Sequence, residues 1–219
     1  MAIDFAAGTL QTANTIIPPE TVADSFGMWL NSDDVITNQY VADRGTNNLN
    51  SLIIGYQDNN VNVFEGSYPC SGVAANTQMS ITVSTWTFVA YSGTGSTSVK
   101  GYVQETAPVS CSGDITRATN TGYVFGGIAG AYYDGRLGMF FWCAGEEVPA
   151  LHMAALGRGV NPFCLGMTNV GVITLQDAIA NTMIYRYSNS TTRGGFSTAG
   201  TAPTLHASNP PVEHIENYL

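Results

Sequence analysis

The chain has 219 residues, of which 44% are hydrophobic and 11% are charged, a balance typical of a globular protein rather than a disordered chain. Seven Lys and Arg against sixteen Asp and Glu give a net charge of −9, and Lys100 is the only lysine. Nucleic acids and anionic membrane surfaces both attract clustered cations, so this composition disfavours both as partners.

The first two thirds of the chain predict antiparallel β-structure. From residue 20 to about 142, short apolar segments alternate with clusters of Gly, Asn, Asp and Ser, a spacing typical of antiparallel sheets. We expect strands at residues 26–30, 51–56, 61–64, 86–91, 99–103, 123–125 and 137–142. In the segment 86–91, apolar Trp86, Phe88 and Ala90 alternate with the residues between them, which indicates one apolar face. Such alternation favours two sheets packed face to face.

One segment has the pattern of a helix. Residues 146–157 place two glutamates ahead of the first turn, a proline at an early helical position and a glycine at the end. We expect one short helix that ends at Gly157 or Gly159. The side chains expected to face inward are those of Val148, Leu151, Ala155 and Leu156.

The composition changes after Pro162. Residues 170–175 and 183–187 predict strands, residues 177–181 are compatible with a helix or a strand, and the sequence from Ser188 onward is rich in Ser, Thr, Gly and Pro. We therefore expect a sandwich over residues 1–162 and, over residues 163–219, strands that complete or flank it. Residues from about 188 to 219 are expected to form an extended arm.

The cysteines and the start of the chain bear on the cellular compartment. Cys70, Cys111, Cys143 and Cys164 lie far apart with no Cys-x-x-Cys pair. The first eight residues lack a basic region before an apolar core, so we expect no secretory signal and four reduced, mostly buried thiols. No apolar run approaches the ~18 residues of a membrane span.

Several short motifs follow one another in a definite order. They are Phe-Gly-Met-Trp-Leu at 26–30, Val-Ala-Asp-Arg-Gly at 41–45, Trp-Thr-Phe-Val-Ala at 86–90, Tyr-Val at 102–103 and Tyr-Asp-Gly-Arg-Leu at 133–137. In this order they resemble the concanavalin-like, laminin-G-type jelly roll, and residues 150–162 resemble its short helix and Gly-x-x-Pro exit. The resemblance covers most of residues 20–162 and implies an all-β fold, a two-sheet antiparallel β-sandwich with one short helix.

The resemblance also implies roles for particular residues. Trp86 would anchor the core between the sheets, and the turn Tyr133-Asp-Gly135 would lead into the last core strand. After Tyr102 and Val103 the family usually has an Asn-Gly or Asp-Gly turn, whereas this chain has Gln104-Glu105. We therefore expect a longer loop towards Cys111.

The end of the chain resembles viral proteins. A strand pair, a Ser/Thr/Gly-rich stretch and a Pro-Pro-Val sequence resemble the laminin-G-type domains of phage structural genes. This resemblance implies a capsid decoration or cement protein in the virion, assembled in the host cytoplasm, that binds the major capsid protein as a homotrimer. Tyrosine is enriched at protein interfaces. The interface residues expected on these grounds are Tyr132, Tyr133, Tyr185, Tyr187, Phe196, Pro210 and Pro211.

A second function remains open, that of a lectin-like, carbohydrate-binding adhesion module on a virion fibre or a cell surface. Tyr and Trp exposed on a loop rim would stack on sugar rings and bind a glycan. The tryptophans Trp29, Trp86 and Trp142 lie in predicted strands and are expected in the core instead.

The sequence carries no catalytic motif that we recognise. Glucanases of the jelly-roll family use Glu-x-Asp-x-x-Glu along one strand, and this string is missing. The acid pairs present, Asp33-Asp34 and Glu146-Glu147, are adjacent in sequence and would face opposite ways in a strand. We therefore expect no enzymatic activity and no organic cofactor.

Calcium is the one cofactor that the sequence leaves open. Related domains often hold it with loop carboxylates and carbonyls. Asp33, Asp34 and Asp58 are oxygen ligands in predicted loops, although aspartate is also an ordinary turn residue.

Overall fold

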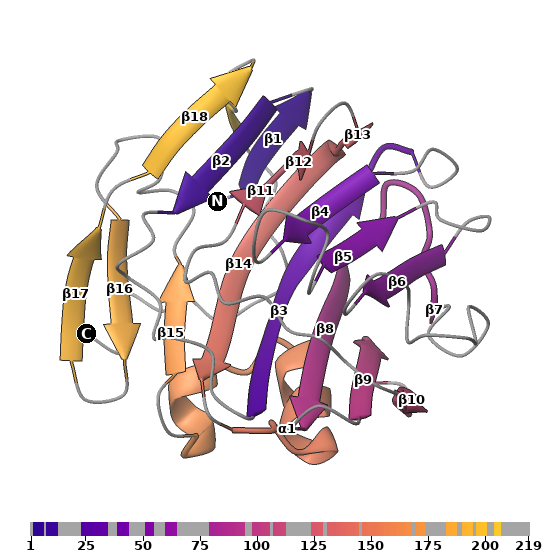
Figure 1. The fold of residues 1–219 in the computed structure, drawn as a ribbon, viewed down its shortest axis with the longest axis vertical. Helices are drawn as coiled ribbons and strands as arrows, with labels where there is room; N and C mark the ends of the chain where they lie inside the picture. The colour runs from indigo at the N-terminus through magenta and orange to yellow at the C-terminus, as the bar shows by residue number, and fades with distance from the viewer. Residues whose placement is uncertain are drawn as a thin grey trace.

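In the computed structural model, long antiparallel strands run side by side and one short α-helix lies near the lower ends of β14, β3 and β8 (Figure 1). The structure describes residues 2–6, 8–12, 23–34, 39–43, 51–54, 60–64, 79–94, 98–105, 107–112, 124–128, 131–144, 146–167, 170–173, 183–187, 190–194, 196–200 and 204–206. Each strand expected from the sequence has a counterpart among these residues. Residues 55–56, 123 and 174–175 of the expected strands lie outside the described residues, as does the segment 177–181.

The larger sheet has the strand order β10-β9-β8-β3-β14-β15-β16-β17. Its strands are β3 (Ala23–Ser32), β8 (Thr87–Thr94), β9 (Ser98–Val103), β10 (Val109–Ser112), β14 (Asp134–Ala144), β15 (Val170–Ile173), β16 (Met183–Tyr187) and β17 (Ser190–Gly194). One edge of β14 is shared, because β15 pairs with its second half and β1 (Ala2–Ala6) with its first half. The strand β19 (Thr204–His206) pairs with β1.

The smaller sheet has the strand order β18-β2-β11-β4-β5-β6-β7. Its strands are β2 (Gly8–Thr12), β4 (Gln39–Asp43), β5 (Ser51–Ile54), β6 (Asn60–Phe64), β7 (Met79–Ser80), β11 (Val124–Phe125) and β18 (Phe196–Gly200). A separate two-stranded ribbon joins β12 (Gly127–Ile128) to β13 (Ala131–Tyr132). In Figure 1 the strands β4, β5 and β6 lie beside the upper part of the long strands of the larger sheet.

The first hydrophobic core lies between the two sheets. Phe125 of the smaller sheet meets Phe140 of the larger sheet edge-on, with ring centroids 4.8 Å apart. Phe140 in turn contacts Phe26 on β3, which stacks on Tyr91 of β8 with centroids 5.0 Å apart. All four side chains are fully buried, and this aromatic packing holds the sandwich together.

The opposite face of the larger sheet carries a second core. The helix α1 (Ala150–Gly157) and the 3₁₀ helix η1 (Pro162–Leu165) pack there. Met153 and Leu156 of α1 join a cluster with Trp29, Phe88 and Phe141, one from each of three adjacent strands. Both faces of β8 are therefore covered, since Val89 and Tyr91 are as fully buried as Phe88. The single apolar face expected for residues 86–91 was wrong for this reason.

The tryptophans lie in these cores much as the sequence predicts. Trp29 and Trp142 are buried, while Trp86 is partly buried and packs against the second core rather than between the sheets.

The cysteines differ in exposure more than expected. Cys143 is buried and Cys164 is exposed, both outside any disulfide, while Cys111 lies in β10 and Cys70 lies outside the described residues.

The helix starts later than the sequence predicts, and one of the four residues expected to face inward is exposed. It begins at Ala150, because Pro149 is the N-cap residue and has an extended backbone with φ −60° and ψ 148°. The C-cap residue is Arg158. Gly159 follows in the left-handed region with φ 89°, as expected for a glycine stop. The buried residues of the helix are Met153, Ala155, Leu156 and Gly157, and Val148 just before it is buried too. The inward positions expected for Val148, Ala155 and Leu156 are therefore confirmed, whereas Leu151, which is 75% exposed, points away from the sheet.

The end of the helix fixes the turn after β9. A Cβ atom on Gly157 would lie 2.6 Å from the Gln104 carbonyl oxygen, so only glycine permits this contact. Gln104 adopts φ 52° where the family has an Asn-Gly or Asp-Gly turn, and its amide Nε2 donates to the Trp86 carbonyl oxygen at 3.2 Å. The strand β10 then pairs with β9 after residues 104–108, the longer connection that the sequence predicts.

The arm expected over residues 188–219 is in part regular structure. The strand β17 pairs with β16, β18 with β2, and β19 with β1. The strands β17, β18 and β19 therefore belong to the two sheets, and β18 and β19 join them through the N-terminal strands β2 and β1, which the sequence analysis does not predict. Residues 207–219, including Pro210 and Pro211, lie outside the described residues. In the described part of the chain, no helix has the length and apolarity needed to cross a membrane.

One buried hydrogen-bond network joins β3 and β8 to the segment before α1. The hydroxyl of Ser25 accepts from the Val148 backbone N–H at 3.0 Å and donates to the Glu146 carbonyl oxygen at 3.1 Å. It also contacts the Ser92 hydroxyl at 2.8 Å. Because Ser25 gives its proton to Glu146, Ser92 must be the donor between the two hydroxyls.

We expect the substitution Ser25→Ala to lower the free energy of unfolding by about 2 kcal/mol, because it leaves the buried N–H of Val148 without an acceptor. Ser92→Ala removes only one hydrogen bond of this network and should cost about 1 kcal/mol. Urea denaturation of both variants measures the difference, and equal costs would show that the Val148 contact is not the important one.

Candidate functional site

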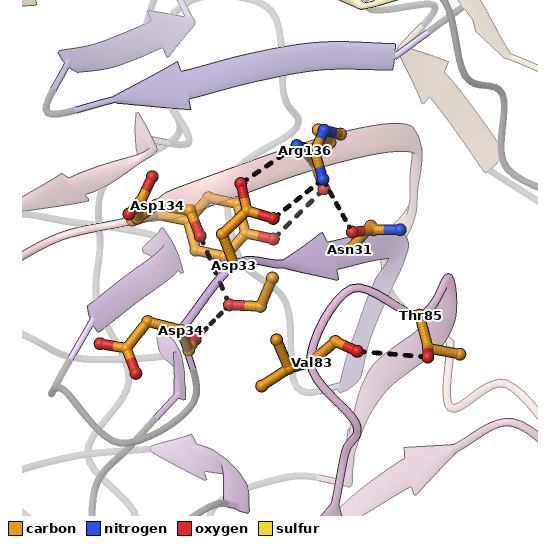
Figure 2. Close-up of polar contacts among 9 residues, drawn as sticks. Asn31, Asp33, Asp34, Val83, Thr85, Asp134 and Arg136 are labelled. Atoms are coloured by element: carbon orange, nitrogen blue, oxygen red, sulfur yellow. Dashed lines mark hydrogen bonds and ion pairs between the residues drawn. The ribbon is translucent and has the colours of Figure 1, made fainter.

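A cluster of polar side chains lies where β3 ends and β14 begins (Figure 2). Its members come from three separate parts of the chain. The antiparallel pairing of β3 with β14 brings two of these parts together, and Gln39 of β4 reaches them from the smaller sheet. We call this set the rim cluster, and it consists of Asn31, Asp33, Asp34, Gln39, Asp134 and Arg136.

An ion pair with two parallel hydrogen bonds lies at the centre of the rim cluster. Arg136 donates from Nη1 to Asp33 Oδ1 at 2.9 Å and from Nη2 to Asp33 Oδ2 at 3.1 Å. A further bond runs from Nη1 to the side-chain oxygen of buried Asn31 at 3.1 Å. The two charged side chains are 21% and 34% exposed, so the pair lies at the surface on a buried support. This bidentate geometry fixes the orientation of both groups.

The backbone around the pair is fixed as well. The N–H of Asp33 donates to the Asp134 carbonyl oxygen at 3.0 Å, and the Ser32 hydroxyl lies against the carbonyl oxygens of Asp34 and Asp134. Buried Gln39 donates to Asp34 Oδ2 at 3.3 Å and accepts from the Asp134 N–H at 2.9 Å. Two buried polar side chains, Ser32 and Gln39, thus bond to both Asp34 and Asp134, and Asp33 is joined to Asp134 through the backbone.

Below the rim cluster, Tyr133 and Gly135 form its support. The hydroxyl of Tyr133 donates to the Arg136 carbonyl oxygen at 3.2 Å, and its N–H donates to the Gly126 carbonyl oxygen at 3.0 Å. Burial of this side chain raises the pKa of the Tyr133 hydroxyl far above its ordinary value. Tyr133 is fully buried and cannot present its ring to a partner, in contrast to the role expected from the sequence.

Two exposed apolar side chains flank the rim cluster. Val83 is 42% exposed and lies on a turn that is bound to the end of β3 by a hydrogen bond from the Ser84 N–H to the Ser32 carbonyl oxygen at 2.7 Å. Tyr132, at 39% exposed, directly precedes Tyr133 and Asp134. Figure 2 shows Val83 and Thr85 on the turn beside Asp33. Exposed apolar residues therefore lie near the charged and amide groups of the rim cluster.

The remaining interface residues expected from the sequence lie elsewhere. Tyr185 and Tyr187 belong to β16 in the larger sheet, and Phe196 begins β18 in the smaller sheet. Of the tyrosines predicted for an interface, the structure places Tyr132 at the surface next to the rim cluster.

Two of the three expected calcium ligands are engaged with other side chains. Asp33 binds Arg136, Asp34 accepts from Gln39, and Asp58 lies outside the described residues. In the part of the chain that the structure describes, no three His, Cys, Asp or Glu side chains come close enough to hold a metal ion.

The second acid pair lies apart from the rim cluster. Glu147 forms an ion pair with Lys100, and Glu146 accepts from the Cys143 thiol at 3.7 Å. Burial and the nearby Glu147 carboxylate together raise the pKa of Tyr102 to about 12. This pair lies just before α1, where it anchors the helix segment against β9 and β14.

Comparison with known proteins finds structures of similar fold but no protein family that matches the sequence. No protein-family model matches the chain, and a search of the curated proteins gave no match. A protein from Bacteroides ovatus that is proposed to bind carbohydrate has a similar structure, with a TM-score of 0.65 and 14% identity. The likeness covers 94% of this chain and 60% of that protein, so this chain spans less than two thirds of its length.

Two further solved structures share the fold. A native heptameric pentraxin from Limulus polyphemus matches with a TM-score of 0.56 and 13% identity, over 89% of this chain and 94% of that one. Domain 4 of an extracellular arabinanase from Geobacillus stearothermophilus, in complex with arabinotriose, matches with a TM-score of 0.51 and 16% identity. That likeness covers 70% of this chain and 89% of the arabinanase domain.

Identities of 13 to 16% establish the fold alone. These likenesses and the strand pairing confirm the all-β, antiparallel sandwich of the concanavalin-like class that the sequence predicts. None of the three structures is a viral structural protein, so the comparisons give no support to the capsid role.

Proposed function

We propose that this chain is a carbohydrate-binding module that holds a glycan at the rim cluster without converting it. The observation that carries the proposal is the structural likeness, over 94% of the chain, to the Bacteroides ovatus protein proposed to bind carbohydrate. The arabinanase domain in complex with arabinotriose supports the same reading.

The side chains of the rim cluster suit a sugar. Sugar hydroxyls donate and accept hydrogen bonds, and the carbon face of a sugar ring is apolar. The carboxylates of Asp33, Asp34 and Asp134 accept from hydroxyls, while exposed Tyr132 and Val83 offer apolar surface beside them. A few convergent polar groups next to aromatic surface are what small-molecule sites generally provide.

The rigidity of the rim cluster adds to this argument. Asp33 is fixed by the bidentate pair with Arg136, and Asp34 by buried Gln39, so their carboxylates are already ordered before a ligand arrives. Binding to ordered groups costs less conformational entropy than binding to mobile ones.

Attachment to a capsid stays a prediction from the sequence, together with the major capsid protein as partner, the homotrimer and the virion location. Cosedimentation with purified capsids and sedimentation equilibrium test these points. They are independent of glycan binding, since an adhesion module can belong to a virion fibre or to a cell surface.

We expect saturable binding to at least one class of oligosaccharide on a glycan array, confirmed by titration calorimetry. Tyr132→Ala should weaken this binding about tenfold, because it removes the exposed ring beside the rim cluster. Leu151→Ala is the matched control, since it also removes an exposed apolar side chain but lies on α1.

Binding that Tyr132→Ala leaves unchanged would place the glycan elsewhere. Absence of saturable binding across neutral and acidic glycans would overturn the proposed function. Release of reducing sugar from a polysaccharide panel would show that the protein is an enzyme rather than a binding module.

A further inference from the structure

We draw no further inference here: the strongest candidate, the exposed apolar surface patch that Pro149, Ala150 and Leu151 form at the start of α1, carries nothing because nothing in the structure shows what covers it.

Discussion

Replacing Gly135 with alanine is expected to lower the free energy of unfolding by about 3 kcal/mol. Gly135 has φ +143°, and a Cβ atom there would lie 2.5 Å from the Asn31 carbonyl oxygen and 2.9 Å from Ser32 Cα. Both contacts are with backbone, so relief would require β3 and β14 to move apart. The same movement would displace Asp33 and Arg136, and we therefore expect glycan binding to weaken as well.

Gly166→Ala is the matched control for this prediction. Gly166 also has a positive φ, +67°, but no atom lies within 4 Å of the position its Cβ would take. Only the unfavourable positive φ of alanine remains, and we expect it to lower the free energy of unfolding by about 1 kcal/mol. Thermal or urea unfolding of the two variants separates steric overlap from backbone conformation. Equal costs would contradict the close approach of β3 to β14 at Gly135.

The substitution Leu156→Ala is expected to lower the free energy of unfolding by about 3 kcal/mol, because the Leu156 side chain is fully buried between α1 and the larger sheet. The same change at Leu151, five residues earlier on the helix, should lower the free energy of unfolding by less than about 0.5 kcal/mol, since Leu151 is 75% exposed. Denaturant unfolding of Leu156→Ala and Leu151→Ala measures both values with one chemical change.

The outcome of this pair bears on the second core. If Leu156→Ala proves as mild as Leu151→Ala, the helix does not pack on Trp29 and Phe88 and the larger sheet has an uncovered face. If Leu151→Ala proves the costlier change, Leu151 rather than Leu156 packs on the larger sheet, which would contradict the buried face described here.

The strands with an apolar run or an apolar alternation could be predicted, because each of them depends mainly on its own residues. The hydrophobic run of β3 and the alternation in β8 are local patterns, and the turns between strands carry the expected Gly, Asn and Asp. What covers each face is not a local property. The second core depends on α1, more than 50 residues after β8 in the chain, and so the burial of Val89 and Tyr91 on one face and Phe88 on the other could not be read from their alternation.

The helix shows how a small shift of its first residue changes which side chains face the sheet, here that of Leu151. The acids and the proline of residues 146–149 are sound helix-start signals, yet the structure places them before the first turn. With the start at Ala150, the stripe that packs on the sheet contains Met153 and Leu156, and Leu151 falls outside it. The packing of Gly157 on Gln104 fixes this rotation, and such a contact depends on tertiary structure.

The polar strands at the C-terminus were hidden for a different reason. The strand β17 consists of Ser, Thr, Thr, Arg and Gly, a composition shared with loops, and it gives no apolar alternation. Its pairing with β16 supplies the hydrogen bonds that define it. The strand β18 is similar, since its partner β2 lies almost 200 residues earlier.

The candidate site was partly visible in the sequence. Asp33 and Asp34 stood out as turn carboxylates, and Tyr132 as an aromatic residue before the Tyr-Asp-Gly-Arg motif. Arg136 and Asn31 were not singled out, because the register between β3 and β14 decides which residues meet across them. The available signal was the alternation of Asp134 and Arg136 around Gly135, which places two charges on the same face of one strand.

A crystal structure of the protein with the oligosaccharide that binds best tests the central claim most directly. The account predicts that a sugar ring lies against Tyr132, with hydroxyls within hydrogen-bond distance of the carboxylates of the rim cluster, and that the Asp33–Arg136 pair remains closed. A sugar bound on another surface, or held by Arg136 after Asp33 has been displaced, would contradict it.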